Sequence, residues 1–330
     1  MTELENGIRR RLDSLTKPQG SLGRLEELAL QVGLIQGTDM PSVGRKAMLL
    51  FCADHGVVEE GVSPFPQQVT RQMVANFGAG GAAITVLCRQ YGIEPVIVDM
   101  GVGKPTCNFA REPAMSRAAA EQAIDVGRAH AADADLLGAG EMGIGNSTAA
   151  AALLCAFTGI DPWDAAGRGT GLGNAGVTRK AEVIARALAL HRPDPADAIG
   201  VLSTLGGFEI AAIAGLILGA AQKRRVVVLD GFISCSAALV VRALEPAALD
   251  YVVYSHRSAE RGHPRMLEFL NARPLLDLDM RLGEGTGAAI GISLIEAAVR
   301  LYREMATFES AAVSTTGAAP PPASPSGATR

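Results

Sequence analysis

The 330-residue sequence is short of aromatic side chains, cysteines and net charge. A formal net charge of −4 gives no basic footprint for nucleic acid, so small molecules are the more plausible ligands. The five cysteines are odd in number and include no CxxC pair, which argues against a disulfide framework and against a zinc ribbon. This cysteine usage fits a reducing cytoplasm.

Long hydrophobic runs are also missing. The longest, residues 210–221, is too short to span a bilayer, and Glu209 lies at its start. The N-terminus alternates charge with Leu and Ile like an amphipathic helix and has no apolar signal region. We therefore expect a soluble protein with no membrane partner. The last twenty residues are mostly Ala, Pro, Ser and Thr, which predicts a disordered tail.

Short apolar runs alternate along the chain with longer Ala- and Leu-rich stretches. Continuous rather than alternating apolar character is typical of strands buried on both faces of a parallel sheet. The pattern predicts strands at 46–52, 94–100, 134–140, 199–206, 225–231, 250–256 and 275–283. It predicts helices at 71–92, 179–191, 208–223, 234–244 and 287–305. This series indicates an α/β fold with a doubly wound, mostly parallel sheet.

Polar or glycine-bearing segments follow each expected strand. Parallel strands place their carboxyl ends at one edge of a sheet, where ligands bind. This edge would collect Asp54, His55, Asp99, Glu141, Asp230, His256, His263 and Glu284. Tight turns and helix caps explain many such residues but not two glutamates set among glycines, Glu141 and Glu284.

Residues 140–157, GEMGIGNSTAAAALLCAF, place glycines and hydroxyls directly ahead of an alanine-rich helix. Free N–H groups and the helix dipole would make a phosphate cradle there, which involves Gly143, Gly145, Asn146 and Ser147. No GxxxxGK[ST] pattern is present, so this is not the P-loop of an NTPase. An ordinary N-cap is the alternative interpretation.

Residues 165–180 contain a formal GxGxxG at Gly171, Gly173 and Gly176. No strand precedes it, as a dinucleotide fingerprint would require, so we expect a second wall around an anion, with Lys180 one turn into the next helix. A long surface loop is the alternative. The histidine spacing matches no zinc pattern, so we expect no metal.

Residues 63–73, SPFPQQVTRQM, form a proline-stiffened loop that enters a helix. One aromatic ring and several amides there could line a pocket for a flat heteroaromatic molecule, although an exposed turn is equally consistent.

Nine stretches in order resemble the nicotinate-nucleotide:dimethylbenzimidazole phosphoribosyltransferase family, over about residues 10–305. They are LTKPQGSLGRLE (15–26), ADHGVVEEGVSPFPQQVT (53–70), GAGGAAITVL (78–87), GEMGIGNST (140–148), GRGTG (167–171), LGGFEIAAIAG (205–215), LDGFIS (229–234), SHRSAERGH (255–263) and RLGEGTGAA (281–289). The resemblance implies a Rossmann-like domain, a small helical domain from the terminal regions, and a homodimer. It implies transfer of the 5-phosphoribosyl group of nicotinate mononucleotide to a benzimidazole, which gives α-ribazole 5′-phosphate for the lower ligand of cobamides (vitamin B12), without a cofactor or metal.

By this resemblance, Glu284 matches the general base and Glu141 the second active-site acid. The positions around the nucleotide are Gly143, Gly145, Asn146, Ser147, Gly169, Lys180, Gly231 and Ser258. Those that border the benzimidazole are Ser63, Gln72 and Leu282. The family's GNTT is GNST here, a change that keeps the hydroxyl.

The domains expected are an N-terminal helical region at 1–40, a catalytic domain at 41–286, a C-terminal helix at 287–309 and a tail at 310–330. Two other functions stay open: an NAD-dependent oxidoreductase built on the GxGxxG, and a non-catalytic nucleotide-binding regulator. Benzimidazoles, purines and phenols all remain possible acceptors.

Overall fold

The structure is a computed structural model that describes residues 2–132 and 134–314, so most of the expected tail lies outside it. Contacts divide the chain into two compact units: residues 43–294, and residues 1–42 together with 295–330. Helix α13 (Thr286–Glu304) begins in the first of these and ends in the second.

The larger unit is built on one parallel sheet of five strands in the order β2-β1-β3-β4-β5, which confirms the expected α/β fold. The strands are β1 (Lys46–Cys52), β2 (Glu94–Asp99), β3 (Leu136–Met142), β4 (Val226–Leu229) and β5 (Val252–Tyr254). All six residues after Lys46 in β1 are buried, because helices cover both faces of a doubly wound sheet. The strand order reverses between β1 and β3, which is where ligands bind in such folds.

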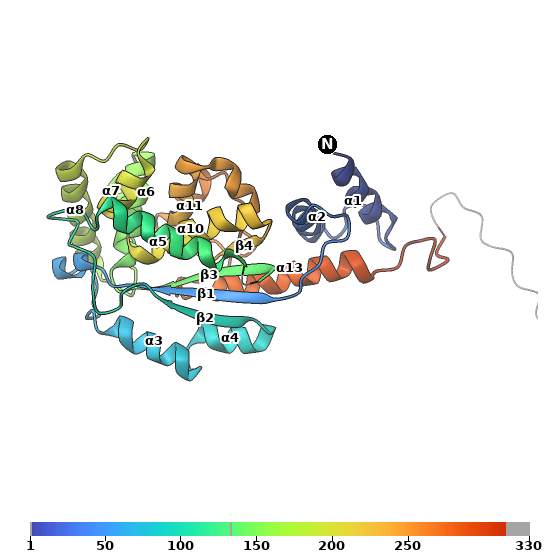
Figure 1. Ribbon diagram of the computed structural model, residues 1–330, viewed down its shortest axis with the longest axis horizontal. Coiled ribbons are helices and arrows are strands. Elements are labelled where there is room, and N and C mark those ends of the chain that lie inside the picture. Colours follow the sequence, from blue (N-terminus) through green and yellow to red (C-terminus); the bar gives the residue numbers. More distant parts are fainter. Residues whose placement is uncertain (1, 133, 315–330) are drawn as a thin grey trace, which may run out of the picture. The chain divides into compact units, whose positions relative to one another are not determined.

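Helices α5, α10 and α11 pack over one face of the sheet, and α3 and α4 lie beyond β2 on the other side (Figure 1). The α-helices of the larger unit before α13 are α3 (Val69–Ala79), α4 (Ala83–Tyr91), α5 (Arg117–Ala129), α6 (Asn146–Thr158), α7 (Pro162–Ala165), α8 (Asn174–His191), α9 (Ala198–Leu205), α10 (Phe208–Lys223), α11 (Phe232–Leu244) and α12 (His263–Phe269). Short 3₁₀ turns occupy Gly56–Glu60, His130–Ala132 and Pro246–Tyr251. Within the described ranges, no helix is both long enough and apolar enough to cross a membrane.

Three sequence expectations are wrong. Residues 199–206 form most of helix α9 rather than a strand, because the Asp197 carboxylate accepts the Gly200 N–H and starts a helix. Residues 275–283 form no strand: their β-bridge, between Leu276 and His256, lies outside the five strands, and the Leu275 N–H donates to the carbonyl oxygen of Tyr254 at the end of β5. The helix expected at 71–92 is two helices, since Gly80 adopts a φ of +75° and ends α3.

The smaller unit has its own apolar core. It contains α1 (Glu3–Ser14), α2 (Arg24–Gln36) and the last turns of α13. Buried Ile8, Leu12 and Leu15 pack with Tyr302, whose hydroxyl donates to the carbonyl oxygen of Asp39 at 2.6 Å. The bond satisfies the phenol while its ring remains in the core.

Helices α5 and α10 approach closely because two glycines face across the contact. A Cβ at Gly215 of α10 would overlap the backbone of Ile124, and one at Gly127 of α5 would overlap the backbone of Ala212. Side chains at either position would push the helices apart.

We therefore expect Gly215→Ala to lower the free energy of unfolding by about 1–3 kcal/mol, the usual cost of overpacking. Gly78→Ala in α3 is the matched control, because a Cβ there meets nothing within 4 Å. It should raise stability by up to about 1 kcal/mol, since alanine is the better helix former. Urea unfolding measures both. Equal effects of the two substitutions would contradict the packing argument.

Candidate active site

A cavity of about 620 Å³ opens at the carboxyl edge of the sheet. Its walls come from the start of α3, the β3–α6 loop, the turn at 169–171, the segments after β4 and β5, and residues 281–284. The volume is typical of a small-molecule site. Strand order and the cavity therefore point to the same edge.

The β3–α6 loop lines this cavity with Gly143, Ile144 and Asn146. Gly145 has a φ of +101° and is the N-cap of α6, but it has no side chain to cap the helix. The loop is joined to α3, because the Thr70 hydroxyl accepts the Ile144 N–H at 3.2 Å. An uncapped helix start with a nearby hydroxyl from Ser147 suits an anion.

Lys180 supports the same loop through Ser147. It is fully buried, and its Nζ donates to Ser147 Oγ at 2.8 Å. Burial lowers the pKa of Lys180 to about 8, while the nearby Glu260 carboxylate opposes that shift. A Cβ at Gly169 would come within 2.8 Å of Ser147 Oγ and 3.3 Å of Lys180 Nζ, so glycine is what lets the 169–171 turn approach. Lys180 does not itself line the cavity.

Glu141, at the end of β3, is buried in the cavity wall. Its Oε2 accepts a hydrogen bond from the Asn146 side-chain amide, and its Oε1 accepts the Glu284 N–H at 3.3 Å. Burial, with further contributions from Asp230 and Glu209, raises the pKa of Glu141 to about 8. The carboxyl group is thus largely protonated at neutral pH.

Glu284 lies in a run of three residues with positive φ: Gly283 at +86°, Glu284 at +62° and Gly285 at +89°. Glycine is required on both sides. A Cβ at Gly283 would lie 2.5 Å from Glu141 Oε1, and one at Gly285 would lie 2.6 Å from Met48 Sδ. The loop therefore lies directly against β1 and β3.

The Glu284 side chain is 7% exposed. Burial raises its pKa, against a lowering by the backbone of Ile84. Its Oε2 has no hydrogen-bond partner within residues 2–132 and 134–314. A buried carboxylate of raised pKa, with an open acceptor atom beside a cavity, is suited to take a proton from a ligand.

Several other residues expected at the edge hold the scaffold. Nε2 of His55 lies 2.7 Å from Glu209 Oε1, and both side chains are fully buried outside the cavity lining. Asp54 accepts the Gly103 N–H, and Asp99 accepts those of Gly101 and Val102. These are turn and support roles.

The loop expected to border a flat molecule contributes only in part. Phe65 and Leu282 line the cavity and are 45% and 58% exposed, and Val69 and Met73 add apolar surface from α3. Ser63 does not line the cavity, but its hydroxyl lies 3.4 Å from that of Thr170, which does. Gln72 is exposed and does not line the cavity.

The chain matches known proteins over most of its length. A family model described as "Phosphoribosyltransferase" matches residues 1–313. A protein of Chloroflexus aggregans named nicotinate-nucleotide–dimethylbenzimidazole phosphoribosyltransferase is 51% identical, with 93% of this chain and 92% of that protein covered. The chain belongs to this phosphoribosyltransferase family.

Two further relatives support the same family assignment. A protein of Geobacter metallireducens with the same name is 50% identical over 92% of each chain. The crystal structure of CobT from Thermus thermophilus superposes with a TM-score of 0.90 at 44% identity, over 95% of this chain and 99% of that one.

Most of the positions expected for this phosphoribosyltransferase family meet at the cavity. Those that line it are Glu284, Glu141, Gly143, Asn146, Ser147, Gly169, Gly231, Ser258 and Leu282. Gly145 does not line the cavity, and a Cβ there would be 3.1 Å from the Cβ of His55. Ser63, Gln72 and Lys180 do not line the cavity.

The sequence pattern predicts that Asp230 and His256 lie at this edge but indicates no role for either at the site. Both line the cavity, and they lie 3.5 Å apart through Asp230 Oδ1 and His256 Nε2. The signal was the acid that follows β4, in LDGF, directly before a glycine. In the part of the chain described, no cluster of three or more His, Cys, Asp or Glu suited to a metal ion was found.

The raised pKa of Glu141 predicts a pH dependence of stability. An unfolded carboxyl of pKa 4.5 loses its proton before the folded one does, so the folded state loses stability as pH rises from about 4.5 to 8. Each pKa unit corresponds to about 1.4 kcal/mol. Glu141→Gln lacks this titration and should gain stability relative to wild type between pH 5 and pH 8, as measured by urea unfolding. Glu182→Gln, on the exposed side of α8, is the control. Parallel curves for wild type and Glu141→Gln would contradict the assignment.

Proposed function

We propose that this chain transfers the 5-phosphoribosyl group of nicotinate mononucleotide to 5,6-dimethylbenzimidazole, giving α-ribazole 5′-phosphate and nicotinate for the lower ligand of cobamides. The observation that carries this proposal is that two features meet at one cavity. The start of α6 has no side-chain cap and is supported by the buried Lys180 through Ser147, and Glu284 has a carboxylate oxygen without a hydrogen-bond partner in the described residues. The names of the relatives supply the substrates.

The reaction breaks the bond between C1′ of the ribose and the nicotinate nitrogen, and forms one between C1′ and a benzimidazole nitrogen. Nicotinate leaves with the electron pair. The benzimidazole N–H proton must then go to a base. Holding the sugar and the acceptor on opposite sides of the reacting carbon supplies much of the rate.

The phosphate would bind at the start of α6. Gly143 and Ser147 line the cavity there, and the Lys180 cation lies directly behind Ser147. Because Lys180 is fully buried, its charge acts on the loop without screening by solvent. Its role would be to orient the Ser147 hydroxyl and favour an anion on the far side.

The acceptor ring would bind between Phe65 and Leu282, with Met73 as further apolar surface. Both Phe65 and Leu282 are exposed although apolar, which is a feature of ligand sites. Glu284 follows Leu282 by two residues and would accept the benzimidazole proton. Glu141 holds the Glu284 backbone N–H, so it would keep the base in place.

Glu284→Gln should lower kcat on the order of 10²–10⁴-fold, because the amide keeps the size of the side chain but cannot take a proton. Binding of nicotinate mononucleotide should change little. Mixing enzyme, nicotinate mononucleotide and dimethylbenzimidazole, and following α-ribazole phosphate by mass spectrometry, measures turnover.

Lys180→Ala is the contrasting variant, expected mainly to weaken nucleotide binding. A wild-type protein that forms no α-ribazole phosphate would overturn the proposed function. Glu284→Gln turning over within a few-fold of wild type would overturn only the role of Glu284.

We also propose that the protein works as a cytoplasmic homodimer, on the family resemblance and on the cysteine usage. Light scattering at micromolar concentration should give about twice the chain mass of 34.1 kDa. A monomeric mass would contradict the dimer.

A further inference from the structure

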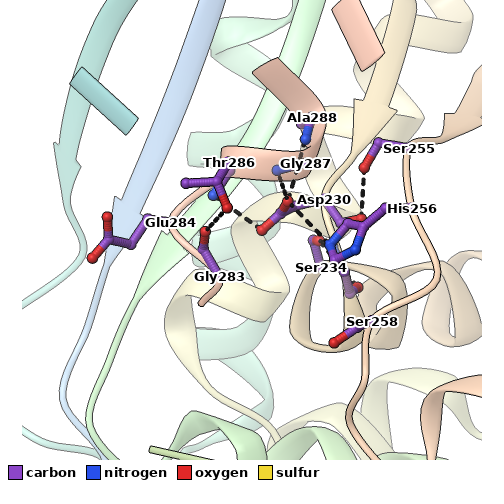
Figure 2. A network of polar contacts seen from close by, with 12 residues as sticks. Asp230, Ser234, Ser255, His256, Ser258, Gly283, Glu284, Thr286, Gly287 and Ala288 are labelled. Atoms are coloured by element: carbon purple, nitrogen blue, oxygen red, sulfur yellow. Dashed lines mark hydrogen bonds and ion pairs between the residues drawn. The ribbon is translucent and has the colours of Figure 1, made fainter. Parts of the chain in front are cut away.

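The carboxylate of Asp230 lies at the first turn of α13, directly after the loop that carries Glu284 (Figure 2). Its Oδ1 accepts the Gly287 N–H at 2.6 Å and the Ala288 N–H at 3.2 Å. Its Oδ2 accepts the Gly285 N–H at 3.1 Å. One side chain, which follows β4, thus satisfies three backbone donors that would otherwise be unpaired at a helix start.

These bonds fix the conformation of Glu284. A left-handed conformation is costly for a residue with a side chain and persists only where its surroundings enforce it. Asp230 holds Gly285 on one side of Glu284, and the Thr286 hydroxyl donates to the Gly283 carbonyl oxygen at 2.9 Å on the other. In Figure 2 the Glu284 side chain points away from Asp230, so the two carboxylates lie apart although the Asp230 side chain accepts the N–H of Gly285, the next residue after Glu284.

The charge of Asp230 also affects the carboxyl group of Glu284. Asp230 is 1% exposed and raises the pKa of both Glu141 and Glu284. Other titratable groups near Asp230 are His256, which follows β5, and the buried Cys235 of α11, whose pKa Asp230 helps to raise, and Glu209 of α10 also raises the pKa of Glu141. A capping aspartate would thereby strengthen the base it positions.

We propose that Asp230 is a positioning residue, which caps α13 and holds Glu284 in its left-handed conformation without touching the reacting atoms. The inference rests on the proposed function, in which Glu284 is the base. It adds that the base depends on a carboxylate more than fifty residues away in the chain.

The test compares Asp230→Asn with Asp230→Glu. Asparagine can keep one acceptor, but it turns an N–H toward one of the three donors and removes the charge. Glutamate keeps the charge and displaces the acceptors. Both should lower kcat on the order of 10²-fold while the KM for nicotinate mononucleotide stays within a few-fold, because misplacement of the base affects the reaction step.

Only Asp230→Asn should also move the acid limb of the kcat–pH profile to lower pH, because the charge that raises the pKa of Glu284 is gone. Asp161→Asn is the matched control: Asp161 caps α7 through the Trp163 N–H at 2.9 Å and lies outside the cavity lining. It should leave kcat, KM and the pH profile unchanged. An effect of Asp230→Asn that falls mainly on KM, or an unshifted profile, would overturn the inference.

Amide hydrogen exchange tests the cap without any activity measurement. In the wild-type protein, the N–H groups of Gly285, Gly287 and Ala288 should exchange much more slowly than those of Asn174 and Ala175, which begin α8 after an N-cap glycine with no side-chain acceptor. Equal rates would overturn the inference even if Asp230→Asn failed to fold. Protected amides in a protein without transferase activity would instead refute the proposed function and leave the cap intact.

Discussion

The burial of carboxylates at one edge of the sheet is the constraint on which the site depends. Glu141, Glu209, Asp230 and Glu284 are each 7% exposed or less, and a buried charge is tolerated only when it is paired, hydrogen-bonded or neutralised. The chain meets this demand in three ways: Glu209 lies against His55, Asp230 accepts three backbone N–H groups, and Glu141 has a raised pKa. Glu284 lines the cavity with an oxygen that has no partner in the described residues, as does Glu260, but only Glu284 stands in the left-handed run at 283–285.

This arrangement explains why a glutamate stands between two glycines. The left-handed run at 283–285 brings the backbone against Gly140, where a Cβ would lie 2.6 Å from the Glu284 carbonyl oxygen. Close packing of the loop on β3 lets Glu141 reach the Glu284 N–H. The glycines therefore serve the position of Glu284, in a conformation that persists only where its surroundings enforce it.

Local sequence patterns were enough to predict the bounds of elements whose residues are apolar in one unbroken run. Strand β1 and helix α10 were predicted with their observed bounds, because burial on all sides leaves a clear signal. The pattern failed for 199–206, where Ile, Val and Leu also fit a helix and the Asp197 cap decides. It failed for 275–283 because a strand needs a partner, and only one bridge forms.

The site could be predicted only in part from the sequence. Glu141 was placed at this edge because β3 ends there. Glu284 was placed there on an expected strand at 275–283 that does not form, yet it lies beside Glu141, 143 residues away in the chain, because the left-handed run at 283–285 packs on β3. The role of Asp230 could not be found this way, because its three bonds depend on where α13 begins in space. The most direct test of the account is a crystal structure with nicotinate mononucleotide and dimethylbenzimidazole bound. The account predicts the phosphate at the start of α6 and a benzimidazole nitrogen within hydrogen-bond reach of the Glu284 carboxylate. A phosphate bound at Gly171–Gly176 instead, or an acceptor nitrogen out of reach of Glu284, would contradict it.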